Sequence, residues 1–154
     1  MATEIERKFL VEVLPDARAL GPGTALRQGY LAEENDVEVR IRMTNDSATL
    51  TIKAGIGLVR TEVELPLPMP AAEALWPVTA GRRVAKVRHH VAAGDAVADI
   101  DVYAEGLTGL STAEVEFPTI GAAAAFTPPA WFGREITGDP GWGNASLARR
   151  GLPT

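Results

Sequence analysis

Hydrophobic and polar residues alternate along most of the first 118 residues, which is the pattern of half-buried β-strands. Clusters of Pro, Gly, Asn and Asp interrupt the alternation and favour turns. The pattern predicts eight strands, which lie at residues 3–11, 24–32, 37–43, 48–53, 58–65, 82–91, 96–104 and 111–117. Most of them follow one another through short turns, an arrangement that is typical of an antiparallel barrel or sandwich.

Three short segments instead favour helices. Residues 69–76 are bounded by prolines and by Gly81, residues 121–126 are rich in alanine, and residues 144–150 form a segment that we expect Asn144 to cap. A length of 154 residues suits one domain over residues 1–154. The fold class is therefore mainly β, of the α+β type.

Charged residues follow the same two-residue period as the strands. Glu4, Glu6 and Lys8 share one face of the first strand. The pattern recurs in later strands, with Arg40 and Arg42, Lys53, Arg60, Glu62 and Glu64, Lys86 and Arg88, Asp99 and Asp101, and Glu114 and Glu116. Neighbouring like charges on one face lie about 6.7 Å apart and repel by about 2 kcal/mol at an effective dielectric constant near 20. A solvated outer face explains one such strand better than six, so we expect these faces to converge on groups of opposite charge.

The two kinds of charge suit two kinds of ligand. Carboxylates provide the oxygen ligands of a hard divalent cation such as Mg²⁺ or Mn²⁺. Arginine and lysine bind phosphate oxygens. Together they predict a metal–polyphosphate site inside the sheet. The apolar faces would then point outward and need cover from the helices or from a second subunit, so we expect a homodimer.

Composition and net charge limit the partners and the location that we expect. The formal net charge of −5 argues against nucleic acid as a partner, and no apolar run reaches the ~20 residues that cross a membrane. The chain has no cysteine and shows no apolar leader segment, which together favour a cytoplasmic location.

Several motifs occur in the order of a known family. Glu4, Glu6 and Lys8 form an ExExK motif near the N-terminus. It is followed by VRIR at 39–42, TIK at 51–53, RTEVE at 60–64, GRRVAKVR at 81–88, DIDVY at 99–103 and AEVEF at 113–117. Over essentially its whole length the chain resembles the CYTH superfamily of triphosphate tunnel metalloenzymes, and its ending, FGREITGDPGWGNASLA, resembles that of the short bacterial members.

The resemblance implies a closed eight-stranded antiparallel barrel, with short helices at its ends and sides, that binds a triphosphate with divalent metal. It implies a metal-binding acidic set of Glu4, Glu6, Glu114 and Glu116, with Glu62, Glu64, Asp99 and Asp101 as further acidic tunnel residues, some of them acting through metal-bound water. It implies a substrate-binding basic set of Lys8, Arg40, Arg42, Lys53, Arg60, Lys86 and Arg88. Lys8 and Tyr30 would form a catalytic pair near the attacking water.

The expected function is an inorganic triphosphatase that converts tripolyphosphate to diphosphate and phosphate. Alternative enzymes on related tunnels are a class IV-like adenylate cyclase, a thiamine triphosphatase and a nucleoside triphosphatase. A non-catalytic polyphosphate or nucleotide binder is the alternative outside enzymes. We expect the two histidines to finish a strand at the surface, and the three tryptophans to be packing residues.

Overall fold

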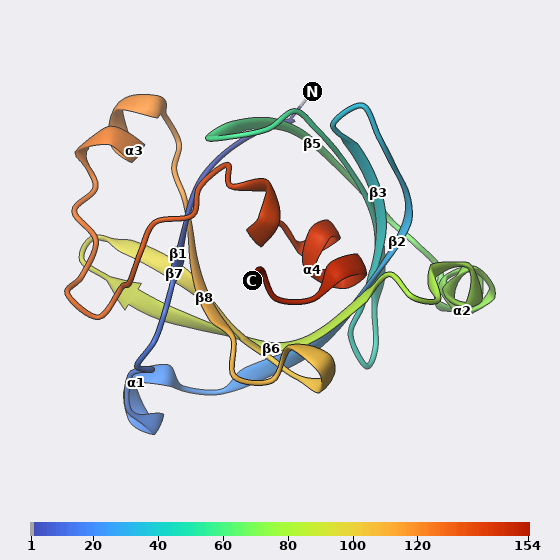
Figure 1. Ribbon diagram of the computed structural model, residues 1–154, viewed down its shortest axis with the longest axis horizontal. Coiled ribbons are helices and arrows are strands. Elements are labelled where there is room, and N and C mark those ends of the chain that lie inside the picture. Colours follow the sequence, from blue (N-terminus) through green and yellow to red (C-terminus); the bar gives the residue numbers. More distant parts are fainter. Residues whose placement is uncertain (1) are drawn as a thin grey trace.

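The computed structural model describes residues 2–154, and its centre is a closed antiparallel β-barrel (Figure 1). Around the barrel the strands follow the order β1-β5-β4-β3-β2-β6-β7-β8. Their bounds are β1 Ala2–Leu10, β2 Gly23–Glu34, β3 Val37–Met43, β4 Ala48–Ala54, β5 Val59–Pro66, β6 Arg83–Ala93, β7 Ala96–Tyr103 and β8 Ser111–Glu116. The prediction of an eight-stranded closed barrel is confirmed.

Strand β1 closes the barrel because it pairs with β5 on one side and with β8 on the other. Glu4 lies opposite Arg60 of β5, and Lys8 lies opposite Glu114 of β8. The ExExK strand therefore stands between two other charged strands that follow it much later in the sequence.

Four short α-helices lie outside the strands: α1 Ala17–Leu20, α2 Met69–Leu75, α3 Ile120–Ala125 and α4 Asn144–Arg150. Single 3₁₀ turns occur at Trp76–Thr79, Glu105–Leu107 and Pro140–Trp142. Helix α1 was not predicted; it is one turn, capped by the side chain of Asp16. No helix among residues 2–154 is long and apolar enough to span a membrane.

The predicted cap of α4 is wrong. Gly143 occupies the N-cap position without a side-chain cap, and Asn144 is the first helical residue. The Asn144 Oδ1 atom instead accepts a hydrogen bond of 2.5 Å from the Tyr103 hydroxyl. A contact to the barrel takes this side chain away from its own helix.

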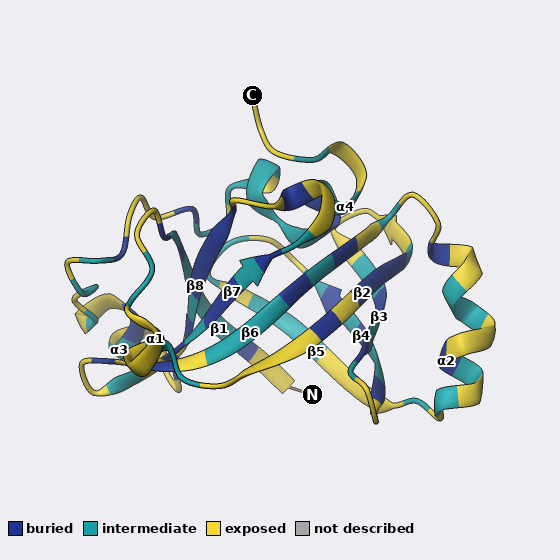
Figure 2. Cartoon of the chain, turned by 90° about the horizontal axis from the view of Figure 1, so that it is seen from below, coloured by how far each residue is buried: buried dark blue, intermediate teal, exposed yellow. Residues whose placement is uncertain are grey.

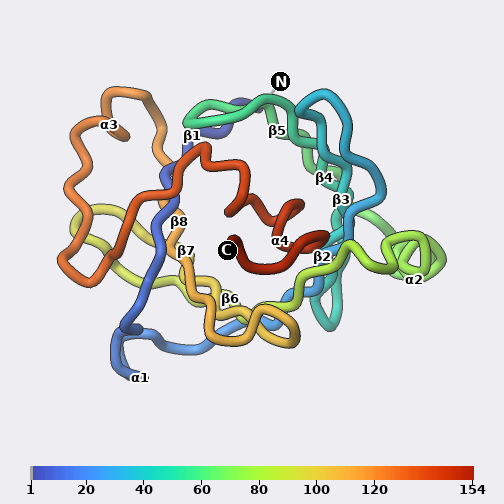
Figure 3. Tube along the Cα trace, in the orientation of Figure 1, coloured from blue at the N-terminus to red at the C-terminus, as the bar shows by residue number. Residues whose placement is uncertain are grey.

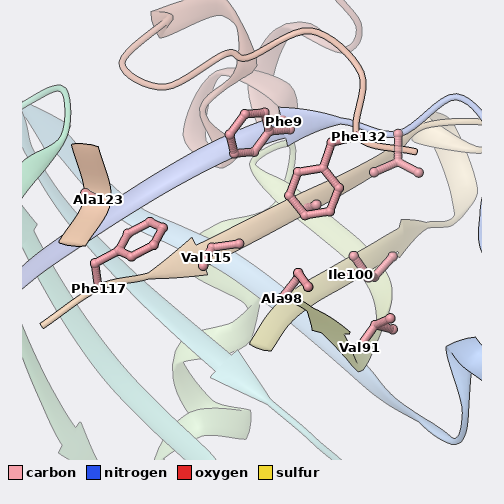
Figure 4. Close-up of a cluster of buried hydrophobic side chains, with 11 residues drawn as sticks. Phe9, Val91, Ala98, Ile100, Val115, Phe117, Ala123 and Phe132 are labelled. Atoms are coloured by element: carbon pink, nitrogen blue, oxygen red, sulfur yellow. The ribbon is translucent and has the colours of Figure 1, made fainter. Parts of the chain in front are cut away.

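The largest apolar cluster lies outside the barrel wall. Phe9, Ile100 and Val115 project outward from β1, β7 and β8 and pack beneath α3 and the segment that carries Phe132 (Figure 4). On another side of the barrel, α2 covers the outward-facing Ile41 of β3 in the same way. Because the helices cover apolar outer faces, the barrel interior remains available for charged side chains.

The C-terminal segment returns to one end of the barrel. Figures 1 and 3 show α4 within the ring of strands when viewed along the barrel, and Figure 2 shows it above the strands in side view. Leu147 of α4 is buried against Val84, Tyr103 and Leu107. This small cluster holds α4 over that end of the barrel.

Candidate active site

The barrel encloses a cavity of about 970 Å³ that receives side chains from all eight strands. The hairpin turns at 33–36 and 55–58 and the segment 136–146 complete its lining. Of the sixteen predicted site residues, all except Lys86 and Asp101 line it: Glu4, Glu6, Lys8, Tyr30, Arg40, Arg42, Lys53, Arg60, Glu62, Glu64, Arg88, Asp99, Glu114 and Glu116. The alternating charges therefore meet in one place, as their shared period suggested.

One ion-pair group lies where β1, β4 and β5 meet. The Lys53 Nζ atom is 2.9 Å from a Glu4 carboxylate oxygen and 3.0 Å from a Glu62 oxygen. Burial raises the pKa of Glu4 even beside this lysine. Burial acts in the same direction on Glu62, but the charge and hydrogen bond of Lys53, together with the hydrogen bond to Glu4 and the charge of Arg40, lower the pKa of that carboxyl. These two carboxylates already share a cation.

A second group surrounds Arg88. Its guanidinium is 3.0 Å from Asp99, 2.8 Å from Asp101 and 3.7 Å from Glu114. Burial alone would raise the pKa of Glu114, but the charges of Lys8 and Arg88 hold it well below its usual value. Glu114 is therefore an ionised carboxylate at neutral pH.

Lys86 and Asp101 form a sealed pair behind Arg88. Both side chains are fully buried, and the Lys86 Nζ atom is 2.6 Å from an Asp101 oxygen. Burial lowers the pKa of Lys86 to about 7 despite this partner. Lys86 contacts the site through Asp101, which is also a partner of Arg88.

Arg40 and Arg42 differ from the other basic residues of the cavity. No carboxylate of residues 2–154 forms an ion pair with either, whereas Lys8, Lys53, Arg60 and Arg88 each have one. Burial and then the charges of Arg40 and Arg88 lower the pKa of Arg42 to about 10. Arg40 and Arg42 are thus adjacent cations with no carboxylate within ion-pair distance, and an anionic ligand would supply a direct partner.

The carboxylates of β1 and β8 fit a metal ion by their chemistry. Glu6 lies opposite Glu116, and two residue pairs further along, on the same face, Lys8 lies opposite Glu114. Burial raises the pKa of Glu6 well above its usual value, and the charges of Glu114 and Glu4 add to the effect. A divalent cation would relieve this repulsion through oxygen ligands. Among residues 2–154 no group of three or more acidic or histidine side chains is already arranged to hold a metal ion.

Lys8 and Tyr30 both line the cavity, and the part of the chain that the structure describes shows no hydrogen bond between them. The Lys8 Nζ atom donates to the Trp142 carbonyl at 3.0 Å. The Tyr30 hydroxyl is buried without a partner in residues 2–154, and burial raises its pKa. The lysine is held by the C-terminal segment, and the tyrosine is free to bond to a ligand.

Sequence reasoning missed three contributions to the site. Glu38 shares the inward face of Arg40 and forms an ion pair with Arg60 at 3.4 Å, which the two-residue period could have indicated. Gln28 accepts a hydrogen bond from Arg42. The segment 136–146 reaches the cavity by folding back over the barrel, and no local pattern encodes that path.

Comparison with known proteins decides the family. The sequence profile of the CYTH domain matches residues 2–151. The chain belongs to the CYTH family. A relative of this CYTH protein from Nitrosomonas europaea, named inorganic triphosphatase, is 43% identical over 148 residues, which cover 95% of this chain and 97% of that protein. A second, from Acetivibrio thermocellus and with the same name, is 35% identical over 152 residues, which cover 97% and 95%.

A solved structure gives the same picture of this CYTH protein. The crystal structure of an inorganic triphosphatase superposes with a TM-score of 0.71 at 39% identity and covers 99% of both chains. Both the barrel and its C-terminal segment therefore lie within the shared region.

The remaining aromatic and basic residues of this CYTH protein have structural contacts. Arg82 donates to the carbonyls of Leu31 and Val78. His89 hydrogen bonds to the Gly21 carbonyl, and the exposed His90 hydrogen bonds to Asp99. Trp76 and Trp131 pack outside the barrel, whereas Trp142 both packs against the cluster beneath α4 and lines the cavity.

Proposed function

We propose that this CYTH protein is a metal-dependent inorganic triphosphatase that converts tripolyphosphate to diphosphate and phosphate, and that residues 1–154 act as one domain. The observation that carries the proposal is that Arg40 and Arg42 have no ion-pair partner in residues 2–154, although they lie in a cavity rich in carboxylates. The name of the two curated relatives supports the reaction class.

In the proposed site the basic residues of the cavity wall bind the triphosphate: Lys8, Arg40, Arg42, Lys53, Arg60 and Arg88. The acidic residues of the wall, Glu4, Glu6, Glu62, Glu64, Asp99, Glu114 and Glu116, would hold Mg²⁺ or Mn²⁺ directly or through water. Lys86 and Asp101 act on the ligand only through Arg88, which Asp101 contacts from behind. The family is metal-dependent. When bound, the metal neutralises phosphate charge and makes a bound water more acidic.

Hydrolysis requires positioning and charge neutralisation more than covalent chemistry. Water forms a new bond to a terminal phosphorus, the bond from that phosphorus to the bridging oxygen breaks, and diphosphate leaves with the electron pair. One proton of the water stays on the new phosphate, and the other is released to solvent. Arg40 and Arg42 stabilise charge on the departing diphosphate without first breaking an ion pair. Lys8, held by the Trp142 carbonyl, and Tyr30 orient the attacking water in this proposal.

The test is phosphate release from purified protein with Mg²⁺ or Mn²⁺, comparing tripolyphosphate, ATP and thiamine triphosphate. We expect a strong preference for tripolyphosphate, loss of activity with a chelator, and loss in Glu116→Gln with an unchanged melting temperature. Thiamine triphosphate is included because the aromatic residue Trp142 is among the residues that line the cavity. Production of cAMP from ATP would favour a cyclase, and tight binding without turnover would favour a polyphosphate binder.

Three further properties stay predictions. These are the cytoplasmic location, the absence of nucleic-acid and membrane partners, and the homodimer. The homodimer is supported by Val59, Val63 and Leu65, which are exposed on the outer face of β5.

A further inference from the structure

Gln28 is a fully buried polar residue on the inner face of β2. It lies two residues from Tyr30 and directly opposite Arg42 in the register of β2 and β3. Its Oε1 atom accepts a hydrogen bond of 3.0 Å from the Arg42 Nε atom. Because an arginine nitrogen can only donate, the carbonyl oxygen of the amide must face Arg42.

The other end of the amide has no protein partner. The Gln28 Nε2 atom is buried, and residues 2–154 offer it no hydrogen-bond acceptor. Buried donors are rarely left unpaired, and each exception needs an explanation. Leucine would fill similar space without an orphan donor. Glutamate would give Arg42 a counter-ion. Glutamine does neither, but it holds the arginine without neutralising it.

Arg42 has three nitrogens, and Gln28 engages only Nε. The two terminal nitrogens lie in the plane that this bond fixes, and they form the fork that binds phosphate oxygens in pairs. The neighbouring Arg40–Tyr30 pair follows the same design, because Tyr30 is also a neutral β2 residue opposite a β3 arginine without a carboxylate. The β2–β3 wall therefore presents two cations beside neutral partners.

We propose that Gln28 is a positioning residue for polyphosphate binding: it orients the Arg42 guanidinium toward the cavity and leaves the full positive charge available to the substrate. This inference rests on the proposed function, since it takes a polyphosphate as the anion. The proposal gives Gln28 a role in the binding of the substrate, although Gln28 is neutral and is therefore not part of the charge pattern of the sequence.

Two variants separate orientation from charge. Gln28→Leu keeps the volume but removes the acceptor for Arg42. Gln28→Glu keeps the acceptor and adds a counter-ion. Thr112→Val is the matched control, because Thr112 is also fully buried, lies on the inward face of β8 and has a hydroxyl with no hydrogen bond to an arginine or to any other group of residues 2–154.

The experiment measures tripolyphosphate binding to each metal-free protein by calorimetry in a chelator, and then KM and kcat with Mg²⁺. We expect Kd and KM to rise about 10-fold in Gln28→Leu and about 100-fold in Gln28→Glu, with smaller changes in kcat. Thr112→Val should bind as the wild type does. Gln28→Glu should melt no lower than the wild type, because a buried cation gains a partner.

Kd values within about twofold of the wild type in both Gln28 variants would overturn the proposal. So would weak binding in Gln28→Leu with normal binding in Gln28→Glu, because charge availability would then be irrelevant. If Gln28→Glu does not fold, Gln28→Leu alone decides. A wild type that binds tripolyphosphate without hydrolysing it would refute the proposed triphosphatase, while the Kd comparison would still decide the role of Gln28.

Discussion

Arg42 hydrogen bonds to the neutral Gln28, lies near the cationic Arg40 and has no ion-pair partner in residues 2–154. An anionic ligand can therefore bind to it without breaking an ion pair. Arg42→Lys keeps the charge, but a single nitrogen cannot bond to Gln28 and present a fork to phosphate. We expect KM for tripolyphosphate to rise about 10-fold in Arg42→Lys and about 100-fold in Arg42→Ala. Initial rates over a substrate series measure this, and equal KM values in the lysine variant and the wild type would contradict it.

Glu6 is a buried carboxyl group that lies near other carboxylates. Burial and nearby carboxylates raise its pKa in the folded protein, so the folded state binds a proton more tightly than the unfolded state does. In metal-free protein, stability from this group therefore falls as pH rises above about 4.5 through the raised folded value. We expect Glu6→Gln to match the wild type at low pH, to melt at a higher temperature at neutral pH, and to lose activity. Melting scans across pH without metal check this, and a lower melting temperature at neutral pH would refute it.

At this scale the sequence predicted the charged lining well, because a strand places every second side chain on one face. Fourteen of the sixteen predicted residues reach the cavity. Lys86 and Asp101 do not, because their mutual ion pair seals them behind Arg88. A two-residue period identifies the face of a strand, and it carries no information on which inward side chains pair with one another. Gln28 was missed because it has no charge.

Among the elements, α4 matters most to the site, because its first residues, 144–146, belong to the segment 136–146 that lines the cavity. Leu147 is 2% exposed and packs against Val84, Tyr103 and Leu107. We expect Leu147→Ala to lower the free energy of unfolding by about 2–5 kcal/mol and to raise KM. Urea unfolding measures the first effect. The exposed Arg150→Ala on the same helix is the control, with a change within about 0.5 kcal/mol.

Elements were predictable where they carry a repeating pattern. All eight strands and the helices at 69–75, 120–125 and 144–150 follow from alternation or from capping and breaking residues, with ends shifted by one or two residues in most cases. Helix α1 is a single turn and is too short to show a period. The position of α4 depends on a tertiary contact, since Asn144 bonds to Tyr103 of β7 instead of capping its own helix.

At the scale of the whole molecule, the outer surface is unevenly covered. The helices and the C-terminal third cover the wall around β1, β7 and β8, whereas Val59, Val63 and Leu65 of β5 are 40%, 38% and 47% exposed. If a second copy covers β5, light scattering should give twice the chain mass of 16.3 kDa. The double variant Val63→Lys, Leu65→Lys should then have the mass of one chain. The control variant Val78→Lys, at an exposed residue outside β5, should keep the mass of two chains. A wild type of single mass would refute the homodimer.

The position of β1 also governs when activity can arise during synthesis. Glu4, Glu6 and Lys8 are synthesised before both strands that flank theirs, because β5 and β8 follow β1 in the sequence. The carbonyl that holds Lys8 belongs to Trp142, close to the end of the chain. A nascent chain therefore carries the ExExK motif throughout translation without an assembled pocket. We expect a chain that stops before Trp142 to hydrolyse no tripolyphosphate, because it lacks the carbonyl that holds Lys8.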